Sequence, residues 1–207
     1  MNAWVLTSRQ RLIDFLDLKN LNSTDNTVLD LVIESATDYV EHYCDRRFKK
    51  TSYTNELYDG TDSPYLVLRE FPVVSGETFT LQRRDSSRNE DDWSTIDTEE
   101  YFVNNDTGEI EYSAGFIFVN YPKHYRVTYT AGYSFDISAG TYLSTLGMGD
   151  LEMAVWKLCA RAWHKRRGDP DVGRERLLNY DVTYVRMTEE DPEVRKVLDK
   201  YAKIDIL

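Results

Sequence analysis

The spacing of apolar residues changes twice along this chain, and this change limits its fold more than any other feature. Near the N-terminus, apolar side chains recur every three or four residues, as on one face of an α-helix: Val28, Leu29, Val32, Ile33, Ala36, Tyr39, Val40 and Tyr43. In the middle they alternate with polar residues, as over residues 78–82, which is typical of strands. After residue 149 the helical spacing returns. We therefore expect an α+β fold: helical core segments 1–51 and 141–207, with an antiparallel β domain, 52–140, inserted between them.

Polar residues predict where the helices begin. Thr7 and Gln10 have the spacing of a capping box, which predicts a first helix ending near residue 18. The second helix begins within the polar run 21–26, which offers several equivalent N-caps. Asp150 predicts the start of a third helix, and Asp191, followed by a proline, predicts the start of a last one.

Turn residues divide the middle of the chain into short strands. Apolar or alternating runs predict strands at 65–68, 78–82, 101–103, 109–112, 116–119 and 125–129. The run 105–108 predicts a hairpin between two of them. The polar segment 84–92 predicts a mobile loop, and 140–149 a linker. We expect one sheet of about five to seven strands.

The two longest amphipathic helices predict how the helical core packs. One apolar face contains Leu31, Ile33, Ala36 and Val40, and the other contains Leu151, Val155, Leu158 and Ala162. Each is long enough to cover the other, so we expect the two faces to be in contact. The inserted domain would then have its ends, near Ser52 and Gly140, close together.

The charge of the chain is concentrated in its middle. The net charge is −11, and residues 52–148 alone carry 16 acidic and 6 basic side chains. Such a chain is a poor candidate for wrapping free DNA or RNA, although a local basic patch remains compatible with it. We expect no signal peptide and no membrane span, and the two distant cysteines suggest reduced thiols in a cytosolic product.

No residue pattern predicts catalysis. The three histidines, His42, His124 and His164, lie outside metal-ligand spacing of one another and of the cysteines. The sequence has no glycine-rich phosphate loop, nucleophile elbow or His-Glu-x-x-His helix. We therefore expect no enzyme activity, no catalytic residues, no metal and no cofactor.

Two basic clusters are candidate partner-binding sites. The first is a stripe on the third predicted helix: Lys157, Arg161 and Lys165, extended by Arg166 and Arg167. The second follows the long helix: Arg46, Arg47, Lys49 and Lys50. Each could instead be a solvated surface whose cations complement a helix C-terminus, and the sequence leaves both interpretations open. The many tyrosines are read first as strand formers and second as a sugar-binding platform.

The order of several motifs resembles one protein family. The motifs are Asp-Leu-Val-Ile-Glu-Ser-Ala at 30–36, Glu-His-Tyr-Cys-Asp-Arg-Arg-Phe at 41–48, Glu-Leu-Tyr-Asp-Gly at 56–60, Phe-Pro-Val at 71–73 and Val-Thr-Tyr-Thr-Ala-Gly-Tyr at 127–133. Followed by the helix from Asp150, they look like the longer head–tail connector (adaptor) proteins of long-tailed bacteriophages and prophages. The resemblance covers most of residues 5–168 and transfers no catalytic or binding residue.

The resemblance implies a structural virion protein of the head–tail neck, made in the host cytoplasm. Such a protein docks as a dodecameric ring beneath the portal protein, extends the channel for genomic DNA without reading its sequence, and links the head to the next neck or tail protein. It has no membrane partner. An alternative is a virion decoration module whose β domain binds a host surface or glycan, and a minor enzyme is a third hypothesis.

Overall fold

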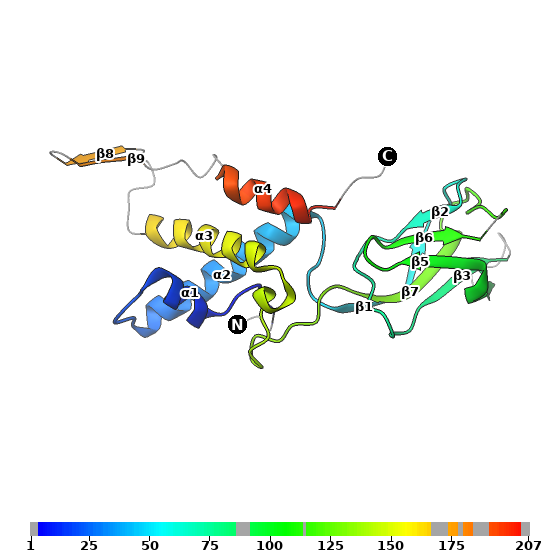
Figure 1. Ribbon diagram of the computed structural model, residues 1–207, viewed down its shortest axis with the longest axis horizontal. Helices are drawn as coiled ribbons and strands as arrows, with labels where there is room; N and C mark the ends of the chain where they lie inside the picture. Colours follow the sequence, from blue (N-terminus) through cyan, green and yellow to red (C-terminus); the bar gives the residue numbers. More distant parts are fainter. Residues whose placement is uncertain are drawn as a thin grey trace. The chain divides into compact units, whose positions relative to one another are not determined.

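The chain folds into two compact units (Figure 1). The computed structural model describes residues 4–85, 92–113, 115–166, 174–177, 180–183 and 191–203. The helical unit joins Met1–Asp45 to Phe135–Leu207, and the β unit is Arg46–Ser134. The α-helices lie in the helical unit and the two larger antiparallel sheets lie in the β unit, so the predicted α+β class is confirmed.

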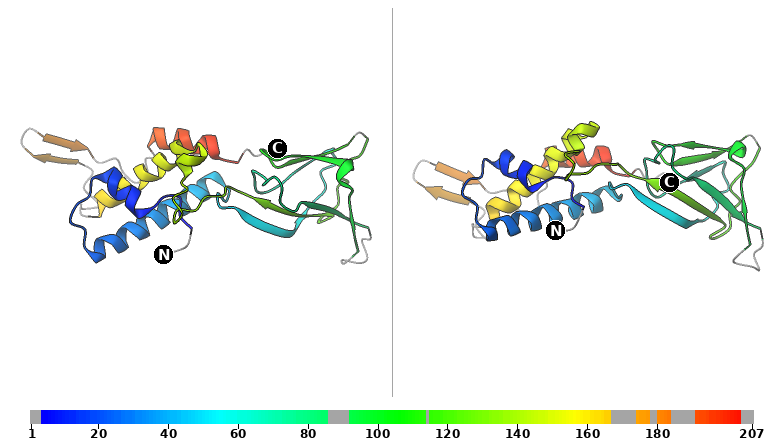
Figure 2. Two further views of the ribbon diagram at one scale, coloured as in Figure 1. Left: turned by 60° about the horizontal axis from the view of Figure 1, so that its bottom comes forward. Right: turned by 90° about the horizontal axis from the view of Figure 1, so that it is seen from below.

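The helical unit is built around two long helices that lie side by side (Figures 1 and 2). The α-helices are α1 (Arg9–Leu16), α2 (Ser23–Cys44), α3 (Gly149–Lys165) and α4 (Pro192–Tyr201). Helix α2 packs along α3, and both α1 and α4 contact each of these two. A 3-10 turn, η2 (Leu143–Leu146), precedes α3, and the strands β8 (Arg174–Leu177) and β9 (Tyr180–Thr183) form an antiparallel pair.

Five of the eight residues predicted at the contact between α2 and α3 are buried, and Leu158 and Ala162 line a groove beside it. Ile33, Ala36 and Val40 of α2 are buried, as are Leu151 and Val155 of α3. Leu31, however, is 58% exposed. Leu31 lies two positions before Ile33, so its side chain is turned by about 200° to the opposite side of the helix. Leu31 therefore belongs to the surface of α2, and its assignment to the packed face was wrong.

The first helix begins one residue later than predicted. Ser8, not Thr7, is the N-cap, because the Ser8 side chain accepts a hydrogen bond from the Arg11 N–H. Thr7 is fully buried and uses its hydroxyl in side-chain hydrogen bonds. The predicted capping box of Thr7 and Gln10 was therefore wrong, and the helix ends at Leu16.

The other helix starts follow the predicted rules to different degrees. Asn22 and Asp25 form a complete capping box at the start of α2, which selects one cap from the polar run. Asp191 caps α4 with Pro192 behind it, as predicted. Asp150 does not cap α3: it lies in the first turn, where its carboxylate complements the positive end of the helix dipole.

The β unit contains two antiparallel sheets, seen as two layers in Figure 2. The four-stranded sheet has the order β1 (Thr51–Tyr58), β7 (Tyr125–Ala131), β3 (Thr80–Arg84), β4 (Trp93–Thr95). The three-stranded sheet has the order β2 (Tyr65–Val67), β6 (Glu109–Tyr112), β5 (Tyr101–Asn104). A 3-10 turn, η1 (Thr98–Glu100), leads into β5.

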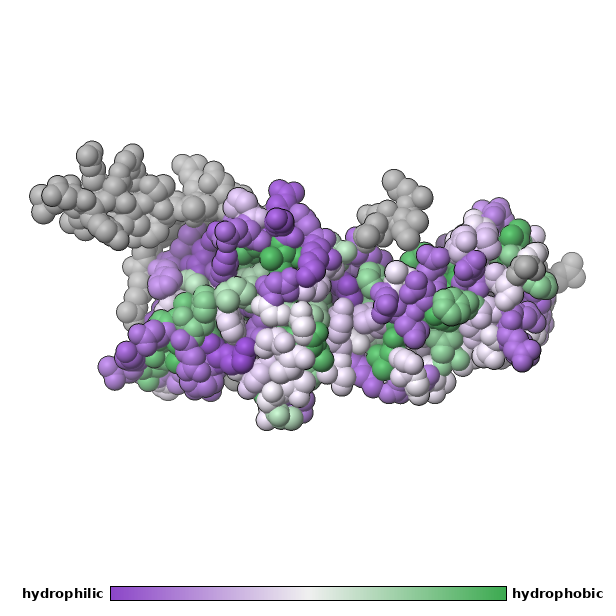
Figure 3. Space-filling model, viewed as in Figure 1, coloured by the Kyte–Doolittle hydropathy of each residue, from purple (hydrophilic) through white to green (hydrophobic). Residues whose placement is uncertain are grey.

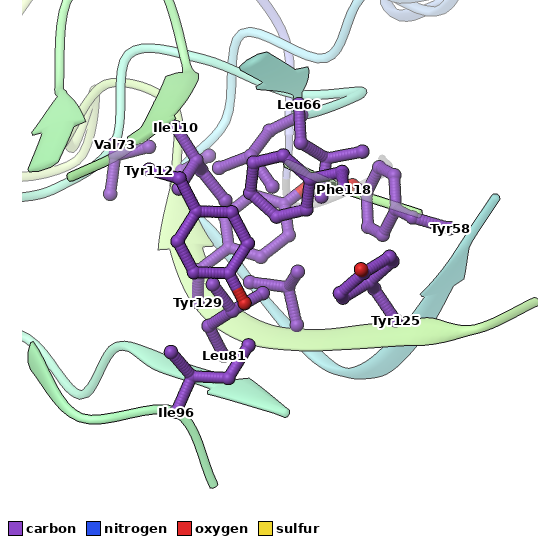
Figure 4. Packing of buried hydrophobic residues seen from close by; sticks show 13 residues of the cluster. Tyr58, Leu66, Val73, Leu81, Ile96, Ile110, Tyr112, Phe118, Tyr125 and Tyr129 are labelled. Carbon is purple, nitrogen blue, oxygen red and sulfur yellow. Dashed lines mark hydrogen bonds between the residues drawn. The ribbon is translucent and has the colours of Figure 1, made fainter. Parts of the chain in front are cut away.

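Both sheets contribute to one hydrophobic core (Figure 4). Leu66 and Ile110 come from the three-stranded sheet, and Leu81, Val127 and Tyr129 from the four-stranded sheet. Since alternate residues of a strand point to opposite sides of the sheet, the side chains between these positions lie on the two outer faces. The β unit is thus a small sandwich with one shared interior and two outer faces.

Three features of the β unit differ from the prediction. The strands form two sheets rather than one. Residues 116–119 are not a strand: only Phe118 makes an isolated bridge and is buried, whereas its neighbours Phe116, Ile117 and Val119 are exposed. Strands β1 and β4 were not predicted, and a register shift between Tyr53 and Glu56 interrupts the alternation of β1.

The two ends of the β unit are joined by hydrogen bonds. The Tyr133 N–H donates to the Phe48 carbonyl at 2.8 Å, and the Lys50 N–H donates to the Tyr133 carbonyl at 3.0 Å. Gly132 makes this approach achievable, because a Cβ there would lie 2.5 Å from the Lys49 carbonyl oxygen and the residue has φ +98°. The ends therefore meet near residues 49 and 133, while Gly140, the expected boundary, belongs to the helical unit.

Candidate interaction site

The basic stripe of α3 is divided between internal contacts and surface. Lys157 forms an ion pair with Glu193 of α4. Arg166 pairs with Asp25 of α2, N to O 2.6 Å, and its guanidinium lies 3.5 Å from the centre of the Trp163 ring. These two cations therefore connect α3 to its neighbours inside the unit. Arg167 lies outside the described residues.

Arg161 lies at a groove formed by α2, α3 and α4. The groove has a volume of about 230 Å³. Its lining is Val32, Ser35, Ala36, Tyr39, Leu158, Arg161, Ala162, Asp191, Val194, Arg195 and Leu198. The floor is apolar and its charged groups come from α3, α4 and the cap of α4. Lys165, one turn beyond Arg161, is half-buried.

The second basic cluster is dispersed by the fold of the β unit. Arg46 is only 6% exposed: its guanidinium donates to the Phe71 carbonyl and lies 4.2 Å from the centre of the Phe71 ring. Lys50 pairs with Glu77 at 2.6 Å. Arg47 and Lys49 are exposed. Arg46 therefore stabilises the interior of the β unit. Partner binding by this cluster stays a prediction, and it now concerns Arg47 and Lys49.

The helical unit contains a buried polar site that the sequence did not reveal. The Glu152 carboxylate in α3 is 1% exposed and accepts from Arg11 Nε at 2.8 Å and Arg11 Nη2 at 3.0 Å. It also accepts from the Thr7 hydroxyl at 3.2 Å and the Ser144 N–H at 3.3 Å. Trp156 donates from Nε1 to the Thr7 hydroxyl at 2.7 Å. This network fixes α1, η2 and α3 to one another.

The helical spacing contains a signal for this site. Glu152 begins a second stripe on α3 that continues through Trp156, Cys159 and Trp163, next to the stripe of aliphatic side chains. A charged residue in line with two tryptophans and a cysteine indicates a paired ion rather than a solvated one. Burial also raises the pKa of the Cys159 thiol to about 12, which leaves that group protonated and unreactive.

A second polar cluster lies within the β unit. Glu56 accepts hydrogen bonds from the hydroxyls of Tyr58 and Tyr129 and pairs with Arg69 at 3.1 Å. Burial alone would raise the pKa of Glu56, but the hydrogen bonds from Tyr58, Tyr129 and Arg69 outweigh it and lower that pKa. Burial raises the pKa of both tyrosines. Tyr58 and Tyr129 are both buried in the core, so neither contributes to a sugar-binding platform on the surface.

The described residues contain no group of His, Cys, Asp and Glu side chains arranged to hold a metal ion. Within the same residues, none of the helices has the length and apolar character needed to span a bilayer. The structure presents three candidate contact surfaces: the groove, the half-buried Arg161 and Lys165 of the α3 stripe, and the faces of the sandwich. Figure 3 shows hydrophobic patches bordered by hydrophilic side chains on both units. Large contiguous patches of this kind are typical of contact surfaces between proteins.

Comparison with known proteins gives one consistent result. No protein-family model and no curated protein matches the sequence. Among solved structures, the fold is similar to a chain in the neck of an empty GTA particle computed with C6 symmetry, with TM-score 0.56 and 14% identity over 95% of this chain and 90% of that chain. It is also similar to a chain in the virion of a native gene transfer agent (GTA) particle, with TM-score 0.52 and 15% identity over 96% and 90% of the two chains. At this identity the likeness shows a shared fold.

Proposed function

We propose that this protein is a structural subunit of a virion neck, a head–tail connector that forms a ring beneath the portal protein. The ring extends the DNA channel and offers a surface to the next neck or tail protein. The observation that carries the proposal is the fold likeness to a chain of a neck, which extends over 95% of this chain and includes both units. The motif order at 30–60 and 127–133 independently resembles phage connectors.

The symmetry of the similar structure favours a ring. That neck was computed with C6 symmetry, which suits a ring whose number of subunits is a multiple of six. A dodecamer satisfies this condition, and it is the number that the connector resemblance implies. The net charge of −11 also suits a channel wall, because acidic side chains repel the phosphates of passing DNA and prevent tight binding.

The C-terminal part of the α3 stripe is the proposed portal contact. We assign the docking role to Arg161 and Lys165, which belong to the last two turns of α3. They lie one turn apart on α3 beside the groove, which places positive charge next to apolar surface. Partner interfaces commonly combine these two features.

The test is attachment of the purified full chain to portal rings encoded in the same genome. We expect the chain to co-sediment with the portal rings and not to sediment without them. An unrelated acidic protein of similar size is the control for trapping. Failure to attach at both low and moderate salt would refute the connector role, and glycan binding without portal attachment would favour the decoration module instead.

A further inference from the structure

The two outer faces of the β sandwich carry opposite charges. On the four-stranded sheet, the charged side chains on the outward positions of the described strands are two arginines, Arg84 of β3 and Arg126 of β7. On the three-stranded sheet, the corresponding charged side chains are two glutamates of β6, Glu109 and Glu111. This segregation occurs in a chain with 11 more acidic than basic side chains.

The basic face is organised around one indole ring. The Arg84 guanidinium lies 5.0 Å from the centre of the Trp93 ring, and that of Arg126 lies 4.5 Å from it. Arg126 Nε donates to Gln82 at 2.5 Å, and Gln82 donates in turn to Thr95. Stacking on the indole holds both guanidiniums in place, and neither has an ion pair among the residues that the structure describes. The basic face is therefore a preformed cationic surface with a central aromatic residue.

The acidic face pairs charge with exposed aromatic surface. Tyr65 of β2, Glu111 of β6 and Phe102 of β5 lie opposite one another across the three strands. Phe102 is 67% exposed and Tyr65 is 42% exposed. Glu111 raises the pKa of Tyr65, and Glu109 adds to this effect, which indicates a local negative field. Within the described part of the chain, neither glutamate has an ion pair.

We propose that the acidic face of one copy of this chain binds the basic face of the next copy. Each face has two charges, which match in number and are opposite in sign, and each has exposed or half-exposed aromatic surface. Opposite charges on flat faces steer association and set its register, and aromatic residues with arginine dominate the centres of interfaces.

The position of the two faces fixes the type of contact. Because they lie on opposite sides of one sandwich, the contact is head-to-tail: one copy uses its acidic face and its neighbour uses its basic face. A head-to-tail contact generates a ring when its rotation closes and a filament when it does not. The statement that this contact is the subunit interface of a neck ring rests on the proposed function. The contact between two copies is inferred without it.

Two variants with reversed charges test the contact. Arg84→Glu with Arg126→Glu makes both faces acidic, and Glu109→Lys with Glu111→Lys makes both faces basic. Each variant should repel itself, and the two mixed in equal amounts should associate with each other. A matched control, Lys19→Glu with Lys196→Glu, changes the net charge as much as the first variant does, but on exposed residues of the helical unit.

Association is measured by sedimentation velocity on the full chain at high concentration and low salt, and by the number of copies bound per portal ring. We expect each variant to lose at least about tenfold in self-association, because like charges in contact cost several kcal/mol and ~1.4 kcal/mol is tenfold. The equal mixture should restore association, and the control should behave as the wild type. Added salt should weaken the wild-type contact.

Circular dichroism of each variant controls for folding, and Phe102→Ser provides a second test if the arginine variant does not fold. Wild-type behaviour of the folded variants, or failure of the mixture to restore association, would overturn the inference. If portal attachment drops while self-association is unchanged, the face binds another protein and the inference is wrong. Portal attachment by the wild type is measured separately. If the wild type self-associates through these faces but does not attach to the portal, the inference stands and the connector role is refuted.

Discussion

Replacing Glu152 by glutamine tests the buried network that joins α1, η2 and α3. The substitution keeps the side-chain volume but removes the charge that accepts four hydrogen bonds, two of them from Arg11. Breaking a buried ion pair costs about 3–5 kcal/mol when the remaining charge is left in the interior. The Arg11 side chain is 29% exposed, so water can solvate the freed guanidinium, and we expect the lower end, about 3 kcal/mol.

The measurement is urea unfolding of the full chain followed by tryptophan fluorescence. Three of the four tryptophans, Trp4, Trp156 and Trp163, are in the helical unit, so the signal reports mainly on that unit. The matched control is Lys19→Gln, whose pair with Asp17 is 75% and 82% exposed and should contribute less than about 0.5 kcal/mol. A loss of under about 1 kcal/mol in Glu152→Gln would refute the reasoning, because it would make the buried pair no stronger than a surface one.

Three further predictions follow from the structure. Gly132→Ala should destabilise the β unit by more than about 2 kcal/mol, because its Cβ would meet the Lys49 carbonyl, whereas Gly76→Ala, with a similar positive φ and open space, should cost only about 1 kcal/mol; thermal unfolding compares the two. The lowered pKa of Glu56 means that its stabilisation is complete above the ordinary glutamate pKa and is lost as pH falls through the lowered value. Glu56→Gln should therefore flatten the acid limb of a stability–pH curve, and an unchanged limb would contradict the assignment. Arg161→Glu with Lys165→Glu should abolish portal co-sedimentation while circular dichroism shows a folded chain, and unchanged attachment would return these side chains to a solvated surface.

Helix α2 and the hairpin of β5 and β6 show what periodicity alone can predict. Helix α2 is marked by eight apolar residues at helical spacing, and the hairpin by a turn between two short alternating runs. Both signals are local, and the hydrogen bonds of both elements join residues close in the sequence. The error at Leu31 arose because the apolar character of a residue was read without its angle around the helix.

Strand β1 could not be predicted from local sequence signals. Half of its residues are exposed, and Asn55 has φ +54° at the register shift, so the strand has neither an apolar run nor a regular alternation. Its position is set by pairing with β7, more than 60 residues away in the sequence. Long-range pairing of this kind leaves no trace in a window of ten residues.

In the candidate sites too, local spacing predicts some features, and others depend on residues far away in the sequence. The sequence placed Lys157, Arg161 and Lys165 correctly on α3, because helical spacing determines which side chains share a face. It did not show that Glu193 and Asp25 neutralise part of the stripe, or that Arg46 is buried, because these partners come from other elements. The opposite charges of the sandwich faces likewise appear only when strands from residues 65, 84, 111 and 126 are placed in two sheets.

Single-particle imaging of the full chain bound to portal rings tests the connector role most directly. The connector role predicts a closed ring of this chain, coaxial with the portal, with a number of subunits that is a multiple of six and a continuous central channel. Single copies bound to the side of the portal, or a ring that blocks the channel, would contradict it.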